Sequence, residues 1–453
     1  MARVKNGRLM TEGAIWKHIV LFAFPLLIGN LFQQFYNTVD SIVVGKFVST
    51  QALAAVGSTG SIINTFIGCF MGLSTGAGVV ISQAYGSQND KAVHDAVHTM
   101  VMTSFIVGIA LSVAGVFGAP YMLRLMSTPA DVFEEAKLYL QIYFAGALTI
   151  VLYNMGSGIM RAVGDSRRPL YFLITSACLN VVFDLIFVLF FRMGIAGVAI
   201  ATVLAQGISA ALILVTLTRS HENYGLRWRE LGIRWSVLKR IFSIGLPSAL
   251  QMMVTSFSNI FVQGYINAFG SAGMAGWSSY SKIDQFVMLP MQAISLASTT
   301  FVGQNIGGRD IPRAEKGVRT SIAISFSVTT VLATLLMIFA RPMLMMFTSE
   351  PAVLDYGELF IRTNTFFLPI TCMNQIYAGA LRGAGDSRAP MIMMLSSYVL
   401  FRQIYLFTVS RIFPGNPQVV SLGYPLGWLL CSTLMTIYYR KSNWQEKALK
   451  QMQ

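Results

Sequence analysis

Two aspartates of this sequence stand inside long apolar segments, where an ionisable side chain is rare. Asp40 lies toward the end of the first long apolar segment, and Asp184 lies in the apolar run 181–191. A charge in a membrane interior is costly, so such residues are candidates for function. Asn180 lies one helical turn before Asp184 on the same face, and Thr202 reaches a similar depth from the following segment.

Two carboxylates with amide and hydroxyl oxygens beside them can hold a small cation. Oxygen ligands suit a hard ion such as Na⁺. The same pair can take up and release a proton, because two buried carboxylates close together do not both remain ionised. We therefore predict a cation-coupling site, for H⁺ or Na⁺, at Asp40, Asn180, Asp184 and Thr202. The alternative for Asp40 is a place at the membrane edge, where water solvates it.

Uncharged polar side chains recur at helical spacing in the first apolar segment and again half a chain later. Asn30, Gln33 and Asn37 follow one face of the first segment, and Gln251, Thr255, Asn259 and Gln263 recur every four residues in the second. Such stripes either line a wet cavity or join helices by hydrogen bonds. We predict cavity walls, because the stripes occupy corresponding places in two halves of the chain.

Charged side chains also fall inside the later apolar segments. Lys282 and Asp284 are too close in sequence to share a helix face, whereas Asp284 and Arg402 could pair across helices. An ion pair with a structural or gating role is one prediction, and direct contact with a substrate is the other. The predicted substrate-cavity residues are Gln33, Gln34, Tyr36, Asn37, Gln251, Thr255, Asn259, Lys282, Asp284 and Arg402.

The composition requires lipid as the solvent for most of these 453 residues. Hydrophobic residues make up 54% of the chain and charged residues only 11%, against about 25% charged in soluble domains. The apolar runs are continuous rather than alternating, and many approach the roughly 20 residues that a spanning helix needs. We predict an all-α membrane protein with spans at about 16–45, 52–80, 94–117, 132–157, 169–191, 195–217, 240–266, 272–300, 317–340, 354–379, 390–412 and 418–439.

The distribution of basic residues predicts the orientation of these spans. Most lysines and arginines fall at the termini and in every second loop, which places those parts in the cytoplasm. The formal net charge of +14 is thereby explained without a nucleic-acid partner. The first apolar segment is longer than a signal-peptide core and lacks a cleavage site, so we expect a retained first helix. The expected location is a bacterial inner (cytoplasmic) membrane, with multiple passes and both termini cytoplasmic.

The side chains that carry most enzyme chemistry are scarce. The four cysteines lie inside predicted spans without paired spacing, and we expect neither a disulfide nor a metal site from them. His18, His94, His98 and His221 lie near cytoplasmic ends. His94 and His98 share a helix face but lack a third ligand at an evident matching depth, and we interpret them as interfacial. We predict no enzyme and no cofactor other than the coupling ion.

The sequence repeats itself at an offset of 221 residues. The segment 158–169, with its Gly-Asp-Ser-Arg turn, returns as 379–390, and Pro25 corresponds within one residue to Pro247. This predicts two six-helix lobes, 1–217 and 239–453, joined by a basic cytoplasmic linker, 218–238. An even number of spans makes the repeats parallel, a construction common in secondary transporters. In each turn we expect Gly to end one helix and Asp and Ser to cap the next.

The order and duplication of these motifs resemble the multidrug and toxic compound extrusion (MATE) transporters. The resemblance rests on Pro25 and Asn37–Asp40 in the first span, on Gln83–Gly86 and Gln304–Gly307, and on the doubled Arg-x-x-Gly-Asp-Ser-Arg motif. It covers nearly the whole chain. It implies two six-helix lobes arranged in a V, a central cavity, and export of amphiphilic or cationic compounds against a proton or sodium gradient.

Within that family the sequence is most similar to the DinF-like branch. The branch keeps acids in the first and fifth helices, here Asp40 and Asp184, with Asn180 and Thr202 close by. The norfloxacin-exporting branch keeps an acid in the seventh helix, where this sequence has Thr255. This difference favours cation coupling in the N-terminal lobe.

Export of small molecules by antiport is therefore the leading hypothesis, and we expect a monomer in the bilayer. The alternative is a flippase for lipid-linked precursors, which has a related architecture. A phosphate-bearing headgroup would call for several intramembrane basic side chains, and only Lys282 and Arg402 qualify.

Overall fold

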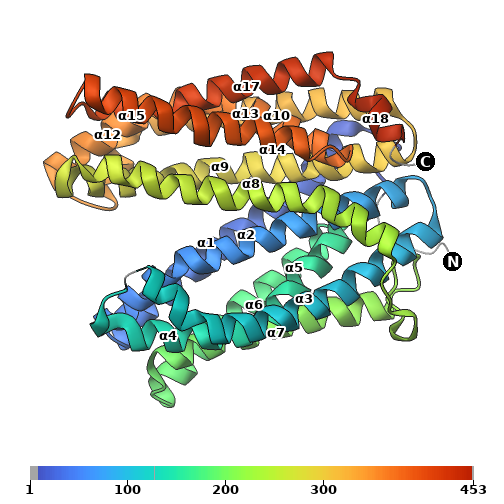
Figure 1. The fold of residues 1–453 in the computed structure, drawn as a ribbon, viewed down its shortest axis with the longest axis horizontal. Helices are drawn as coiled ribbons and strands as arrows, with labels where there is room; N and C mark the ends of the chain where they lie inside the picture. The colour runs from blue at the N-terminus through green and yellow to red at the C-terminus, as the bar shows by residue number, and fades with distance from the viewer. Residues whose placement is uncertain (1–8, 127, 451–453) are drawn as a thin grey trace. The chain divides into compact units, whose positions relative to one another are not determined.

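Helices joined by short connections form the described part of the computed structural model, residues 9–126 and 128–450 (Figure 1). Ten helices of this part are long and apolar enough to cross a membrane, and an eleventh span results when one bent pair is counted together. Each of the twelve predicted spans coincides with a helix or with consecutive helical segments. The prediction of an all-α membrane fold is confirmed.

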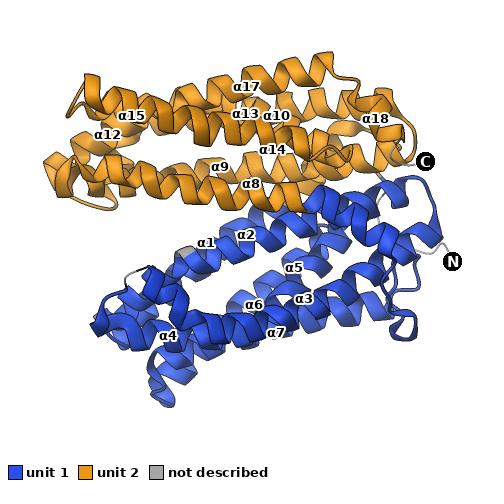
Figure 2. Ribbon diagram, in the orientation of Figure 1, with its two compact units in different colours: residues 1–9, 25–245 blue, residues 10–24, 246–453 orange. Residues whose placement is uncertain are grey.

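Two compact units make up the chain, and they exchange the beginnings of two long helices (Figure 2). The first unit is built on Pro25–Gly245, and the second on Met10–Phe24 together with the chain from Leu246 onward. The expected lobes, 1–217 and 239–453, followed the sequence repeat and took no account of this exchange. In both helices the change of unit falls within two residues of a proline, Pro25 in α1 and Pro247 in α8. A proline inside a helix removes a backbone hydrogen bond there and weakens the continuity of the helix.

The first unit contains most of α1 and the following helices as far as the start of α8. Their bounds are α1 (Ile15–Phe47), α2 (Thr50–Gly86), α3 (Asp90–Leu125), α4 (Ala130–Ala145), α5 (Ala147–Ala162), α6 (Arg167–Leu185), the π-helical η1 (Ile186–Phe190), α7 (Gly194–Arg219) and the short 3₁₀ turn η2 (Trp228–Glu230). The helices α4 and α5 form one span bent by 50° at Gly146.

The second unit repeats this plan from α8 onward. Its helices are α8 (Trp235–Asn267), α9 (Gly270–Gly307), α10 (Ile311–Ile338), α11 (Ala340–Met345), α12 (Pro351–Thr365), α13 (Leu368–Gly383), α14 (Arg388–Leu395), the π-helical η3 (Ser396–Phe401), α15 (Arg402–Ile412), α16 (Pro417–Ser421), α17 (Gly423–Lys441) and α18 (Trp444–Lys450). The break between α12 and α13 falls at Phe366 and Phe367, the counterpart of the bend at Gly146.

Matching glycines let two helices approach closely in each unit. A Cβ on Gly158 would lie 2.3 Å from Ser74 Oγ, and one on Gly379 would lie 2.7 Å from the Ser295 carbonyl oxygen. Ser74 donates a hydrogen bond to the Asn154 carbonyl, and Ser295 donates the counterpart to the carbonyl of Gln375. The sequence repeat is therefore a repeat of packing, in which α2 meets α5 as α9 meets α13.

The two Gly-Asp-Ser-Arg turns have the expected helix stop. Gly164 and Gly385 have φ values of +86° and +96°, a left-handed conformation that glycine adopts without strain. The cap of the next helix comes from the aspartates alone: Asp165 Oδ1 accepts hydrogen bonds from the backbone N–H groups of Arg167 and Arg168. Ser166 makes no side-chain cap bond, so the prediction that Ser also caps is wrong.

Hydrogen bonds that involve side chains hold the segments that each unit receives from the start of α1 and of α8. In the second unit, Met10 N–H donates to Gln304 Oε1 at 2.8 Å, and the Arg313 guanidinium donates to the carbonyls of Met10 and Gly13. In the first unit the corresponding glutamine, Gln83, accepts a hydrogen bond from Arg240 through its Oε1. A residue shortly before α1 and a residue in the first turns of α8 are thus each bound to one of the two repeated glutamines, whose partners the sequence motif did not show.

Candidate functional site

The predicted coupling residues come together in the first unit. Asp40 lies on α1, Asn180 and Asp184 lie one turn apart on α6, and Thr202 lies on α7. Asp40 and Asp184 are within hydrogen-bonding reach of each other. Asn180 Nδ2 donates to Thr202 Oγ1 at 3.5 Å, and the Thr202 hydroxyl donates to the Val198 carbonyl at 3.1 Å. The arrangement brings four oxygen-bearing side chains together from three helices.

Several of these oxygens are buried acceptors without a donor. Asp184 is 0% exposed and Asn180 is 2% exposed. Asp40 Oδ1, both carboxylate oxygens of Asp184 and Asn180 Oδ1 accept no hydrogen bond from the described residues. Buried polar atoms are almost always paired, because an unpaired one loses its hydration without compensation. A cluster of unpaired acceptors fits a proton or a hard metal cation such as Na⁺.

An apolar core packs beside this cluster. Val44 follows Asp40 by one helical turn, Val188 follows Asp184 by one turn, and Val198 precedes Thr202 by one turn, and all three belong to a single buried cluster. The π-helical segment η1 begins two residues after Asp184. Such segments widen the helix locally and occur often at functional sites. Asp184 is thus buried next to apolar packing and an irregular helical segment, whereas Asp40 is partly buried.

Polar residues of α1 predicted for the substrate cavity lie along the same helix as Asp40. Gln33, Gln34 and Tyr36 are partly buried, whereas Asn37 is exposed. Tyr36 is within hydrogen-bonding reach of Gln33 and of Gln206 on α7. These residues therefore belong to the polar side of the first unit.

The predicted residues of the second unit divide into a buried group and an exposed group. Gln251 Oε1 and Thr255 Oγ1 are buried without a hydrogen-bond partner among the described residues. Asn259 accepts a hydrogen bond from Arg402 at 2.8 Å. Lys282 is exposed and lies 5.7 Å from the ring of Phe347. Lys282 is thus separated from the buried polar groups of α8.

The predicted ion pair between Asp284 and Arg402 is wrong. Arg402 donates to Ser258 and Asn259 instead, and its guanidinium lies 4.7 Å from the ring centre of Tyr424. Asp284 lies within hydrogen-bonding reach of Tyr280, and its Oδ1 accepts nothing from the described residues. The sequence placed both charges in the same half but contained no information on the tyrosines that occupy the space around them.

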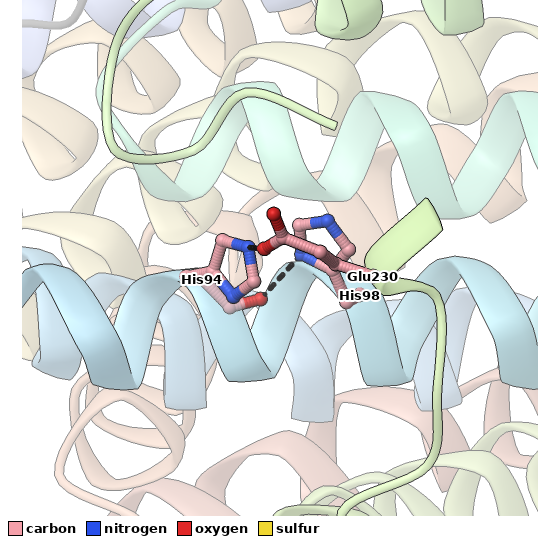
Figure 3. Close-up of side chains that lie close together, drawn as sticks. All are labelled: His94, His98 and Glu230. Atoms are coloured by element: carbon pink, nitrogen blue, oxygen red, sulfur yellow. Dashed lines mark hydrogen bonds and ion pairs between the residues drawn. The ribbon is translucent and has the colours of Figure 1, made fainter. Parts of the chain in front are cut away.

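A cluster that sequence reasoning missed lies where the interlobe linker meets α3. His94 and His98 stack at 3.8 Å between ring centres, and Glu230 of the linker lies 2.7 Å from His94 Nε2 (Figure 3). Glu230 is the third potential metal ligand that the sequence did not reveal, because it is far from the histidines along the chain. His98 has both nitrogens engaged: Nδ1 with the His94 carbonyl and Nε2 as acceptor from Arg227 N–H. The cluster therefore fastens the linker to α3.

Comparison with known proteins agrees with this architecture. The MatE family model matches residues 25–186 and 247–407, one copy in each half of the chain. The chain belongs to the MatE family. As a member of this family it is a multi-pass membrane transporter rather than an enzyme.

Relatives of this MatE protein match over most of their length. The probable multidrug resistance protein YpnP of Bacillus subtilis is 30% identical over 97% of this chain and 98% of its own. A FAD transporter of Shewanella oneidensis is 23% identical over 79% of this chain and 80% of its own. A solved MOP superfamily transporter from Pyrococcus furiosus, described as having a binding pocket of reversed polarity, superposes with a TM-score of 0.91 at 23% identity and covers both chains fully. The structural likeness confirms the two-lobed fold of twelve helices.

Proposed function

We propose that this MatE protein exports amphiphilic small molecules by antiport with H⁺ or Na⁺, which binds at Asp40, Asn180, Asp184 and Thr202. The observation that carries the proposal is the set of buried acceptor oxygens without donors in the first unit. A cation supplies the missing positive charge, and the four side chains offer only oxygens to it. The second unit has Val262 and Tyr405 near the corresponding positions, so the coupling chemistry belongs to one half.

Coupling requires the cation to bind one state of the protein more tightly than another. Neutralising Asp40 and Asp184 removes the repulsion between them and favours a closer approach of α1 to α6. Pro25 lies within α1 at the change of unit and weakens the helix there. In the proposed cycle, cation binding shifts α1 between two shapes about Pro25, and release of cargo accompanies that shift.

The proposed setting is the bacterial cytoplasmic membrane, with both termini in the cytoplasm and the protein acting as a monomer. The excess of basic residues at the termini and in alternate loops supports this orientation. The cargo residues on α1 and α8 are polar stripes on largely apolar helices, which suits compounds with both apolar and polar parts. Relatives named for multidrug resistance and for FAD transport are consistent with a broad cargo range.

The flippase alternative receives less support from the basic side chains. A lipid-linked precursor presents several phosphate charges, which call for a group of basic residues within the membrane. Of the two candidates, Arg402 is buried and Lys282 is exposed beside Phe347 on a different helix. A single buried arginine suits a single anionic group better than a diphosphate.

The test is gradient-driven ethidium export in proteoliposomes, with a proton gradient and a sodium gradient imposed separately. Asp184→Asn and Asp40→Asn should each abolish the gradient-driven component. Asp131→Asn is the control, because Asp131 is an acid of the same unit but is exposed in the first turn of α4. Coupled export that survives in Asp184→Asn, with protein content equal to the wild type, would refute the assignment.

A further inference from the structure

A buried arginine in the second unit has no acidic partner. Arg402 opens α15 directly after the π-helical segment η3, and its side chain is 4% exposed. An arginine side chain keeps its positive charge in proteins. A buried charge without a counterion is costly, and inside a membrane protein it commonly marks a place where a ligand or an ion binds.

Every contact of the Arg402 guanidinium that the structure defines is neutral. Nη2 donates to Ser258 Oγ at 3.2 Å and to Asn259 Oδ1 at 2.8 Å, and the ring of Tyr424 lies beside the charge. Nε has no hydrogen-bond partner among the described residues. No carboxylate of the described chain forms an ion pair with Arg402. The charge is thus held in position without being neutralised.

The two partners on α8 are held differently. Ser258 is buried and also accepts a hydrogen bond from Gln403 Nε2, which further donates to the Ser258 carbonyl. Asn259 is exposed, and its Oδ1 contacts Arg402. Asn259 is therefore the movable member, and rotation of its side chain would open Nη2 to an incoming oxygen.

The face of α8 that carries Asn259 is polar. Thr255, Ser256 and Gln263 lie three or four residues from Asn259 and share its face, and Ser256 is exposed. The exposed rings of Phe257 and Phe261 lie on the opposite side of the helix. An anionic group can therefore approach the guanidinium along polar side chains of α8. Arginine is suited to carboxylate and phosphate because its fork of N–H groups can donate two parallel hydrogen bonds.

We propose that Arg402 is an anion-recognition point, which takes the carboxylate or phosphate of an amphiphilic cargo in place of the Asn259 amide. The inference rests on the proposed export function and adds to the cargo range a class of compounds that carry an anionic group. In this proposal the two units bind different ligands. Acidic side chains of the first unit bind the coupling cation, and a basic side chain of the second unit binds the anionic group of the cargo. Ser258, Gln403 and Tyr424 keep the guanidinium in place.

The decisive variant is Asn259→Asp, which places a carboxylate where the amide oxygen now accepts from Arg402. An internal carboxylate would neutralise the arginine and compete with a cargo anion, while the fold gains an ion pair. Asn267→Asp adds the same charge further along α8, where Asn267 accepts from Gln263 instead, and serves as the matched control. Arg402→Gln removes the charge altogether.

The measurement is equilibrium binding of carboxyfluorescein and of ethidium to the purified full-length protein in detergent, followed by fluorescence anisotropy. We expect the ratio of carboxyfluorescein affinity to ethidium affinity to fall by about tenfold or more in Asn259→Asp and in Arg402→Gln. The ratio should stay within about twofold in Asn267→Asp. The melting temperature of Asn259→Asp should equal or exceed that of the wild type, which separates lost recognition from lost folding.

Three outcomes would overturn the proposal. The first is an unchanged affinity ratio in both Asn259→Asp and Arg402→Gln, and the second is a wild type that does not bind carboxyfluorescein saturably. The third combines two results: phosphatidylglycerol displaces carboxyfluorescein from the protein, and proteoliposomes show no carboxyfluorescein export. Together they would assign the site to a lipid headgroup. Export under an imposed gradient is scored separately. Gradient-driven ethidium export with a failed anion test refutes only this inference, whereas the absence of gradient-driven export of both ethidium and carboxyfluorescein refutes the antiport function.

Discussion

Asp40 on α1 and Asp184 on α6 lie within hydrogen-bonding reach of each other, with buried oxygens that accept nothing from the described chain. A ligand that fills this place must carry positive charge. Cation binding to the folded state alone would stabilise it in proportion to the logarithm of the cation concentration. The pair therefore links coupling to stability, which can be measured without a transport assay.

We predict that the melting temperature of the wild type depends on the coupling ion. If the ion is Na⁺, the melting temperature should rise with added Na⁺ at constant ionic strength. If the ion is H⁺, it should rise as the pH is lowered over the neutral range. Saturation at a hundred times the dissociation constant corresponds to about 2.7 kcal/mol. The double variant Asp40→Asn with Asp184→Asn should lose this response and keep a stable fold, because two repelling carboxylates are removed. Differential scanning fluorimetry in Na⁺ and in choline buffers measures it, and an identical response in the double variant would contradict the site.

The glycine pair Gly158 and Gly379 provides a test of the packing repeat. Alanine at either position would force the helices apart, because its Cβ would lie well inside contact distance of Ser74 or Ser295. We expect each substitution to destabilise the protein by about 1–3 kcal/mol, as overpacking does in other cores. Gly57→Ala is the matched control, since a Cβ there meets nothing within 4 Å. Chemical or thermal unfolding of the three variants should show losses for the pair and no loss for the control.

The sequence predicted the parts of the fold that depend on local pattern or on repetition. The spans and the two helix stops at Gly164 and Gly385 follow from apolar runs and the repeat of segment 158–169. The meeting of Asp40 with Asp184 could be anticipated, because both are acids at matching depth in a membrane, where few other positions suit them.

Other features depended on three-dimensional contacts that no local pattern contains. Arg402 was expected beside Asp284, but Ser258, Asn259 and Tyr424 occupy its surroundings. The third member of the histidine cluster, Glu230, comes from a polar linker whose docking cannot be inferred from hydropathy. Pairings of single polar residues between distant segments therefore escape a method that relies on periodicity and depth.

The cap at Asp165 predicts a particular dependence of stability on pH. Burial raises the pKa of this carboxyl above its ordinary value, although Arg168 and two backbone N–H groups oppose the shift. A carboxyl whose pKa is higher in the folded state binds its proton more tightly there, so its ionisation lowers stability as the pH rises from the unfolded pKa through the folded pKa. Asp165→Asn keeps an acceptor oxygen and should flatten this part of the stability curve above about pH 4.

The matched comparison for that prediction is Asp165→Ala, which removes the cap itself. Loss of a cap of this kind costs about 1 kcal/mol at any pH. Melting temperatures between acid and neutral pH for the wild type and both variants distinguish the two effects. A curve for Asp165→Asn that parallels the wild type throughout would show that the buried carboxyl does not titrate differently in the folded protein.

The His98 contacts predict that the interlobe linker is fastened by hydrogen bonds rather than by a metal ion. His98→Ala removes the acceptor of the Arg227 N–H and the side-chain contact with the His94 carbonyl, and loss of a hydrogen bond costs about 0.5–1.5 kcal/mol. Residues 227–234 should then detach from α3 more often, so trypsin should cleave after Arg227, Arg229 or Arg234 several times faster than in the wild type. The exposed His221, changed to Ala, is the control. Added Zn²⁺ should not slow cleavage of the wild type, because both ring nitrogens of His98 are already engaged in hydrogen bonds. If Zn²⁺ protects the wild type from trypsin and this protection disappears in Glu230→Gln, the cluster is a metal site instead.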